Sequence, residues 1–204
     1  MGVTSWLEGA INRVARSLEF AITGQSNFQI RLGSATKNSQ PVDDLSQANI
    51  ALDEVRTKLR SLFSFDFSWP ILVELKQPPA KGWRGGFYNP EGNLGRYTLL
   101  DLKGFPTHQI QLMPGLARLR FCALLAHELT HAYQREKNIL TSNHALREGM
   151  ARWVEWHFLK LCKAPEAEKL LKLRLYTFGR SIDTLIELEK KQGRPRTVEW
   201  LMSQ

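Results

Sequence analysis

Apolar residues recur every three or four positions in two stretches of the first third of the chain. Between Trp6 and Ile22 this spacing predicts a helix that ends before Gly24, and a second helix is predicted from Asp44 to about Phe63. The first helix could lie on a membrane surface or dock on the protein core, and we prefer docking. Residues 28–32 alternate as a short strand does, and the Ser/Asn/Gln-rich residues 33–43 predict a loop.

The middle of the chain carries the alternating pattern that is typical of strands. Ile71–Leu75 is predicted to be a strand, and residues 82–113 are predicted to form a small, mainly antiparallel sheet. Within that segment Phe87–Tyr88 and Tyr97–Leu100 flank a turn-rich stretch, and His108–Leu112 would be the next strand.

Helical spacing dominates the rest of the chain. Helices are predicted over about residues 165–178 and 180–191; Gly193–Pro195 ends the second, and Thr197–Met202 forms a short last helix. The predicted fold class is therefore α+β and helix-rich, with the small sheet before the helix that carries residues 127–131.

Residues 127–131, His-Glu-Leu-Thr-His, spell the pattern H-E-x-x-H within an apolar helical stretch. Histidines four residues apart project from one helix face, so both imidazoles can bind one metal ion. Zinc lowers the pKa of a bound water to about 7, and Glu128 could accept its proton. Unpaired polar groups in such an apolar stretch would be costly. The pattern predicts His127 and His131 as zinc ligands and Glu128 as the general base.

A catalytic zinc site uses three protein ligands and leaves one position for water. Three downstream residues compete for the third position: Glu148, His144 and His157. Glu148 opens a second helical stretch, whose start one of residues 141–143 could cap. We prefer Glu148, because His144 lies near the helix start and His157 is displaced along the helix axis. One Zn²⁺ per chain is expected.

Other residues could assist this chemistry. Glu155 lies two turns after Glu148 on the same helix face and could hydrogen-bond a ligating histidine, although a solvated surface charge is an equal alternative. A developing oxyanion would need a further donor. The candidates are Tyr133, Tyr88, His144, Arg152 and Tyr176, and none is preferred.

Leu125–Tyr133, together with the later Arg147–Met150, resembles the gluzincin zinc metallopeptidases. The similarity is greater to the peptidase domain of the DA-one-like family, the ubiquitin-activated metallopeptidases that limit organ growth. Gln109–Leu116 resembles the strand and turn before the zinc helix in that family, so the resemblance covers about residues 80–160.

The resemblance implies a zincin-like fold and a zinc peptidase with ligands His127, His131 and Glu148 and base Glu128. Its partner would be a protein or peptide substrate, which an edge strand within residues 82–113 could bind by strand addition. Ubiquitin is implied as a partner by the resemblance alone. The chain lacks the cysteine-rich zinc modules of the plant members and any recognisable ubiquitin-interacting segment.

The length of 204 residues suits one domain. It would comprise an N-terminal helical part over 1–65, a catalytic core over 66–160 and C-terminal helices over 161–204. No apolar run approaches the roughly 20 residues that a membrane span needs. The start of the chain does not have the pattern of a signal peptide, and the two cysteines, at 122 and 162, lack C-x-x-C partners. A cytoplasmic protein is expected.

The net charge of +8 is concentrated in residues 103–204, which hold seventeen Lys/Arg and ten Asp/Glu. Such an excess can attract nucleic acid or an acidic substrate. Most of the basic residues alternate with acidic ones, however, so a solvated surface is the preferred interpretation. Nucleic acid is not expected as a partner.

The leading hypothesis is a zinc-dependent endopeptidase in which Glu128 takes a proton from the zinc-bound water. One alternative is a DNA-associated protease of the SprT type with His144 as third ligand, but Asn143 stands where the glycine of that signature is expected. Another is a non-catalytic, zinc-stabilised binding protein. The glutamate at position 128 argues against it, because a structural site has no use for a base.

Overall fold

The computed structural model describes residues 40–77, 94–139, 143–165 and 179–204. All of them belong to Thr36–Gln204, the second of two compact units into which the chain divides. The predicted helix over Trp6–Ile22, the strand over residues 28–32, Phe87–Tyr88 and nearly all of the predicted helix 165–178 lie outside the described residues.

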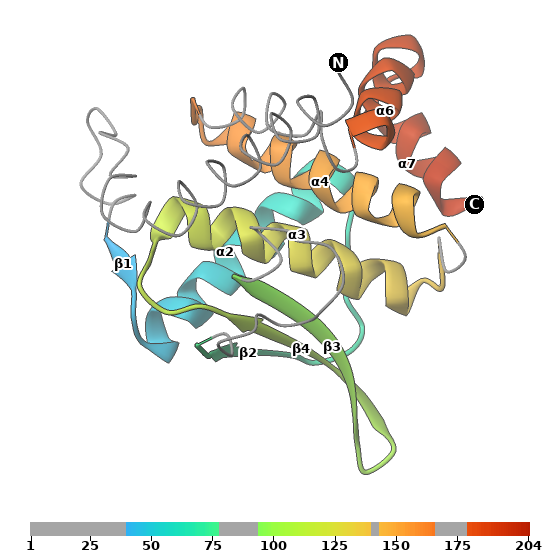
Figure 1. Ribbon diagram of the computed structural model, residues 1–204. Helices are drawn as coiled ribbons and strands as arrows, with labels where there is room; N and C mark the ends of the chain where they lie inside the picture. Colours follow the sequence, from blue (N-terminus) through green and yellow to red (C-terminus); the bar gives the residue numbers. More distant parts are fainter. Residues whose placement is uncertain (1–39, 78–93, 140–142, 166–178) are drawn as a thin grey trace, which may run out of the picture. The chain divides into compact units, whose positions relative to one another are not determined.

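The described part confirms the α+β class: it contains five helices and a small sheet (Figure 1). The helices are α2 (Leu45–Phe63), α3 (Arg118–Glu136), α4 (His144–Leu161), α6 (Gly179–Gln192) and α7 (Arg194–Met202). The strands are β1 (Pro41–Val42), β2 (Ile71–Leu75), β3 (Gly95–Leu102), β4 (Phe105–Leu112) and β5 (Leu116–Ala117). No helix in the described ranges is long and apolar enough to cross a membrane.

Helix α3 is the centre of the unit, since it contacts α2, α4, β3 and β4. Fourteen of its nineteen residues are buried, which explains why its sequence is apolar on nearly every side. On one flank Tyr133 stacks on Phe65, with ring centroids 4.0 Å apart. Helix α4 crosses the other side and in turn contacts α6. The H-E-x-x-H segment is therefore held by packing from several directions.

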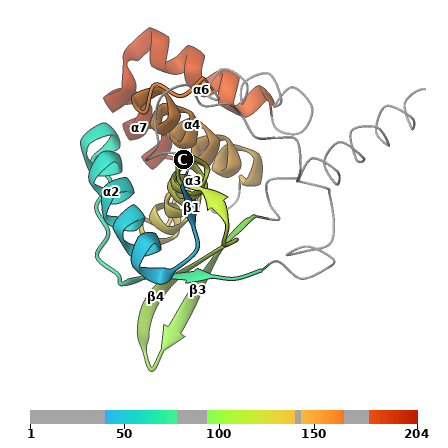
Figure 2. The ribbon, with the colours of Figure 1, turned by 90° about the vertical axis from the view of Figure 1, so that its left-hand side faces the viewer.

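The three-stranded sheet has the order β2-β4-β3. Strands β3 and β4 form an antiparallel hairpin that extends away from the helices (Figure 2). Its two-residue turn is Lys103–Gly104, both with positive φ (58° and 85°), as the right-handed twist of a hairpin requires. The hydrophobic pattern did not predict this turn, and β3 and β4 are both longer than predicted.

Strands β3 and β4 pair antiparallel, as predicted for residues 82–113, and the addition of β2 makes the sheet mixed. Strand β2 has the predicted bounds but pairs in parallel with β4, with Ile71 opposite His108. The alternation of apolar and polar residues along a strand does not distinguish parallel from antiparallel pairing, because side chains alternate between the two faces of the sheet in both cases. A second small pair, β1 with β5, places part of the predicted loop 33–43 in antiparallel pairing.

The helix starts follow local signals in the sequence. The Asp44 side chain accepts a hydrogen bond from the backbone N–H of Gln47 (2.8 Å) at the start of α2. The Asn143 side chain does the same for Leu146 (2.9 Å) and so fixes the start of α4. Gly193, with φ of 82°, separates α6 from α7, which begins earlier than predicted and includes Pro195.

A buried polar cluster joins α4 to α6. The Glu189 carboxylate accepts hydrogen bonds from Trp153 Nε1 (3.0 Å), His157 Nε2 (2.7 Å) and Arg194 Nε (3.0 Å). Arg194 also approaches His157 Nδ1 (3.1 Å). Since an arginine can only donate, that nitrogen accepts and the imidazole is neutral. His157 thus connects α4 to α6 and lies outside the group formed by His127, His131 and Glu148.

Acidification should destabilise this cluster. Burial lowers the pKa of His157 to about 4, although the charge of Glu189 opposes the shift. The unfolded chain, with a pKa near 6.5, binds a proton between pH 6.5 and 4 that the folded chain does not. Stability should therefore be full above pH 6.5 and fall by about 1–3 kcal/mol toward pH 4. The unfolding free energy, measured with urea at several pH values in this range, should depend less on pH for His157→Gln. An unchanged pH dependence would contradict the role given to His157.

Candidate metal centre

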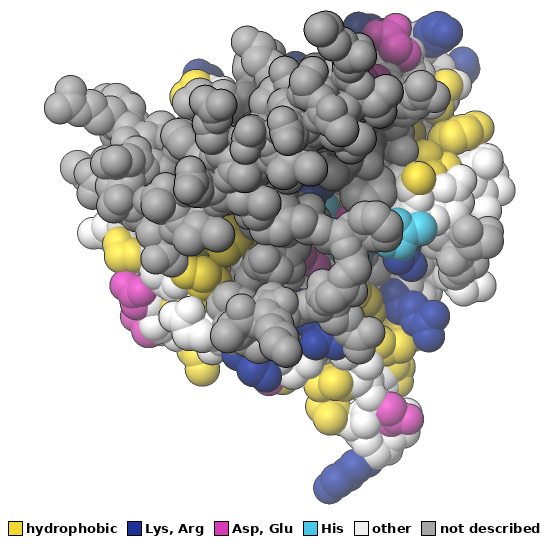
Figure 3. All heavy atoms as spheres, viewed as in Figure 1, with side chains coloured by type: hydrophobic (Ala, Val, Ile, Leu, Met, Phe, Trp, Pro, Cys, Tyr) yellow, Lys and Arg dark blue, Asp and Glu magenta, His cyan; other side chains and the backbone are white. Residues whose placement is uncertain are grey.

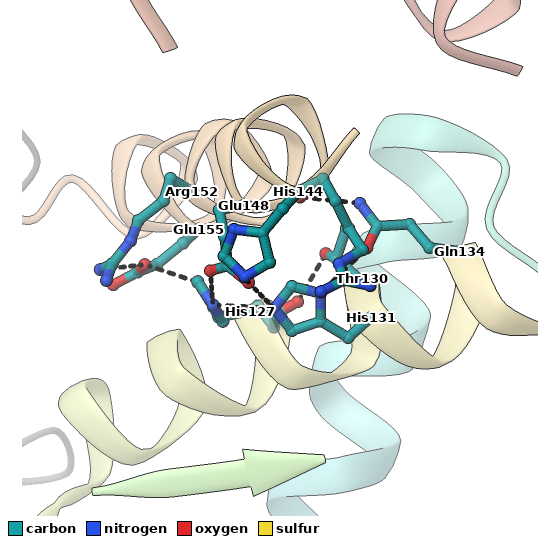
Figure 4. A network of polar contacts seen from close by, with 10 residues as sticks. His127, Thr130, His131, Gln134, His144, Glu148, Arg152 and Glu155 are labelled. Atoms are coloured by element: carbon teal, nitrogen blue, oxygen red, sulfur yellow. Dashed lines mark hydrogen bonds and ion pairs between the residues drawn. The ribbon is translucent and has the colours of Figure 1, made fainter. Parts of the chain in front are cut away.

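Helix α3 brings two imidazoles to one point. His127 and His131 lie one turn apart, and their Nε2 atoms are 3.2 Å from each other. The rings meet nearly edge to face, at 79° with centroids 4.9 Å apart. Both Nε2 atoms point toward helix α4, as the close-up shows (Figure 4).

Helix α4 supplies a carboxylate at the same point. Glu148 Oε1 lies 3.4 Å from His131 Nε2, and Glu148 Oε2 lies 3.6 Å from His127 Nε2. The three side chains offer ligand atoms that all lie within 4.8 Å of one another. In a tetrahedral zinc site with bonds of about 2.0–2.1 Å, neighbouring ligand atoms are about 3.3 Å apart. The observed separations are close to that spacing.

The charge of the cluster also fits a cation. Glu128 and Glu155 are buried beside the two histidines and Glu148. Burial raises the pKa of Glu128; it acts in the same way on Glu148, but hydrogen bonds and charges from the histidines outweigh it and lower that pKa. Buried like charges repel each other strongly. A divalent ion between the histidines and Glu148 would offset this repulsion.

Glu155 is placed to orient His127. Its Oε2 lies 3.4 Å from His127 Nδ1, and Arg152 Nη1 lies 3.7 Å from the same oxygen. His127 Nδ1 is buried and makes no hydrogen bond of normal geometry, so a small movement would complete one. A proton on Nδ1 leaves the Nε2 lone pair free for a metal. The predicted supporting role of Glu155 therefore has a geometric basis.

Gln134 orients the second histidine and was not found from the sequence. Its Oε1 lies 2.9 Å from His131 Nδ1, and its Nε2 donates to the Arg147 carbonyl (2.9 Å) on the neighbouring helix. Because the amide nitrogen is committed to that carbonyl, the amide oxygen faces His131 and accepts its Nδ1 proton. The polar residue three positions after His131 on an apolar helix was the available signal.

Changes at Gln134 should separate metal binding from stability. Gln134→Leu removes both contacts, so zinc binding should weaken by about 10–100-fold and the melting temperature should fall. Gln134→Glu keeps an oxygen that accepts the His131 Nδ1 proton but loses the hydrogen bond to the Arg147 carbonyl. Its zinc affinity should therefore be close to that of the unmodified protein, while its melting temperature should stay low. Competition with a chromophoric chelator measures the zinc affinity, and thermal denaturation measures the melting temperature. Gln111→Leu is a matched control, since Gln111 is buried but bonds Glu74. Equal loss of affinity in both Gln134 variants would contradict this role.

The Glu128 carboxylate lies against the start of strand β3. A Cβ atom added to Gly95 would be 3.0 Å from Glu128 Oε1 and 2.8 Å from Leu112 Cδ2. Only a glycine at position 95 allows the Glu128 carboxylate to keep its observed position. No local sequence pattern predicts this contact, because residues 95 and 128 are distant along the chain.

Gly95→Ala should displace Glu128 by a few tenths of an ångström and leave the metal ligands in place. We expect bound zinc to be retained and turnover to fall about tenfold, because a small misplacement of a reacting group lowers the rate. The double variant Gly95→Ala/Leu112→Val relieves the second clash only. If it recovers full turnover, packing against Leu112, and not Glu128, is the cause.

The structure separates the remaining candidates. His144 lies on the rim, with Nε2 4.0 Å from Glu148 Oε1 and a side chain 64% exposed. The ring of Tyr133 is stacked on Phe65, which argues against Tyr133 as an oxyanion donor. Tyr88 and Tyr176 lie outside the described residues. Arg152 remains beside the centre through its contact with Glu155.

Comparisons with known proteins leave the fold family open. The chain matches no protein-family model, and no curated protein sequence and no solved structure is significantly similar to it.

Proposed function

We propose that this chain is a zinc-dependent peptidase of the gluzincin type, with His127, His131 and Glu148 as zinc ligands. The convergence of these three side chains from two helices is the observation that carries the proposal. Each imidazole also has a partner that directs its other nitrogen, as histidines bound to metal usually have. Three ligands leave a position for water, which a structural zinc site would close with a fourth residue.

Bound zinc would polarise the scissile carbonyl and lower the pKa of a bound water. Glu128 would take the proton of that water and deliver it to the leaving amine. Burial raises the pKa of this carboxyl, which suits a group that accepts and then donates a proton. Glu155 and Gln134 would hold the imidazoles in the required tautomers.

An extended substrate would lie along β3. This strand begins at Gly95, next to Glu128, and has no second strand beside it among the described residues. Its free edge can pair with a peptide backbone without reading a sequence. His144 and Arg152 flank Glu148 one turn to either side and are the candidates for an oxyanion donor that the described residues place beside the centre.

The alternative with His144 as third ligand is less well supported. Its imidazole is mostly exposed and stands outside the group formed by His127, His131 and Glu148. A cytoplasmic location is an expectation. Ubiquitin is a candidate partner from the family resemblance alone, and ubiquitin-dependent activation does not follow from that resemblance.

Metal analysis and proteolysis test the proposal together. Protein purified without chelator should contain about one zinc per chain and should cleave an unfolded protein substrate. Removing the metal with a chelator should abolish cleavage, and added zinc should restore it. Zinc-loaded protein that cleaves no unfolded or peptide substrate would support the non-catalytic alternative instead.

A further inference from the structure

Arginines whose side chains form no hydrogen bond or salt bridge gather on the elements that build the centre. Among the arginines whose side chains are described, five form an ion pair or stack on an aromatic ring: residues 56, 60, 118, 152 and 194. The other five have no side-chain hydrogen bond, ion pair or ring contact: residues 96, 120, 135, 147 and 196. All of these except Arg196 lie on β3, α3 or α4.

Two of these arginines bracket the histidines on α3. Arg120, His127, His131 and Arg135 are spaced by seven, four and four residues, so they follow one face of the helix. The charge of Glu155 acts on Arg120, and the charge of Arg135 acts on Tyr97 of β3. Both arginines are exposed. The row of metal ligands thus has a basic residue beyond each end.

Helix α4 repeats this arrangement around its own ligand. His144 precedes Glu148 by four residues and Arg152 follows it by four. The space-filling view shows a histidine at the surface with Lys or Arg side chains on one side of it (Figure 3). The described carboxylates nearest the centre, Glu128, Glu148 and Glu155, face the histidines or their metal position. None of the three forms a hydrogen bond or salt bridge with Arg120 or Arg135, although the charge of Glu155 acts on Arg120.

We propose that the metal centre selects polypeptide segments with acidic side chains on both sides of the scissile bond. This inference rests on the proposed peptidase function and names its substrate class. A substrate carboxylate on one side would meet Arg120, and one on the other side would meet Arg135. Exposed charge pairs contribute modestly, so each arginine should account for about three- to tenfold in kcat/KM.

Quenched fluorescent peptides with one central sequence test this directly. Their flanks carry glutamate, glutamine or lysine, and each is assayed with zinc-loaded protein at about 50 and 300 mM salt. The glutamate peptide should be cleaved at least tenfold faster than the glutamine peptide at low salt, and high salt should narrow the difference. The lysine peptide should be the slowest.

Variants locate the effect. Arg120→Gln and Arg135→Gln should each lower the ratio of acidic to neutral rates by about three- to tenfold. The pair Arg120→Glu/Arg135→Glu should reverse the preference toward lysine. Arg196→Gln is the matched control: it removes one exposed, unpaired arginine from α7 and should leave the ratio unchanged. Zinc content is measured for each variant.

Binding distinguishes failure of this inference from failure of the proposed function. Zinc-loaded Glu128→Gln protein is titrated with the same peptides, and fluorescence anisotropy reports affinity without hydrolysis. The acidic peptide could bind the Glu128→Gln protein preferentially while the unmodified protein cleaves none of the peptides. That result would overturn the peptidase proposal and leave the charge preference standing. Cleavage or binding that is independent of peptide charge at both salt concentrations would overturn the charge preference.

Discussion

Glu128→Gln should lower kcat by about 10²–10⁴-fold while the protein keeps about one zinc per chain. The amide has nearly the shape of the carboxylate, so the contact with Gly95 and the packing of α3 are preserved. It cannot accept a proton from the zinc-bound water, and hydrolysis therefore lacks its base. Initial rates on a peptide substrate, with metal content measured on the same samples, give the result.

Glu187→Gln provides the control for this change. It makes the same replacement at an exposed residue of α6 that pairs only with Lys190 among the described residues. Its turnover should equal that of the unmodified protein. Full activity of Glu128→Gln would exclude Glu128 as the base, and loss of its zinc would point to a structural role for this carboxylate.

Glu148→Ala should weaken zinc binding by at least about 100-fold, more than the loss of a supporting partner does. It removes one of the three ligand atoms, on the carboxylate that lies against both imidazoles. His144→Ala should bind zinc nearly as well as the unmodified protein, because its imidazole is 4.0 Å from Glu148 and mostly exposed. Zinc affinities by chelator competition compare the two variants.

The opposite outcome would be equally clear. If His144→Ala loses zinc and Glu148→Ala retains it, the third ligand is a histidine and the SprT-type alternative gains support. Circular dichroism of both variants guards against a general loss of folding, since Glu148 is half-buried in α4.

The sequence by itself determined the features that depend on near neighbours in the chain. The helix over Leu45–Phe63 and the strand over Ile71–Leu75 follow the hydrophobic pattern, and Asn143 is one of the predicted caps for α4. The pairing of His127 with His131 also follows, because a helix places residues four apart on one face. Each of these signals acts over a few residues, so no distant part of the chain is needed to read it.

The tertiary structure decided which residues surround the histidines and how the strands pair. Helix α3 is buried on nearly every side, so its pattern could not show that Tyr133 packs against Phe65 while Gln134 bonds His131. The parallel pairing of β2 with β4 and the contact of Gly95 with Glu128 join segments that are far apart in sequence. Such contacts depend on the way whole elements pack, and local periodicity carries no information about that packing.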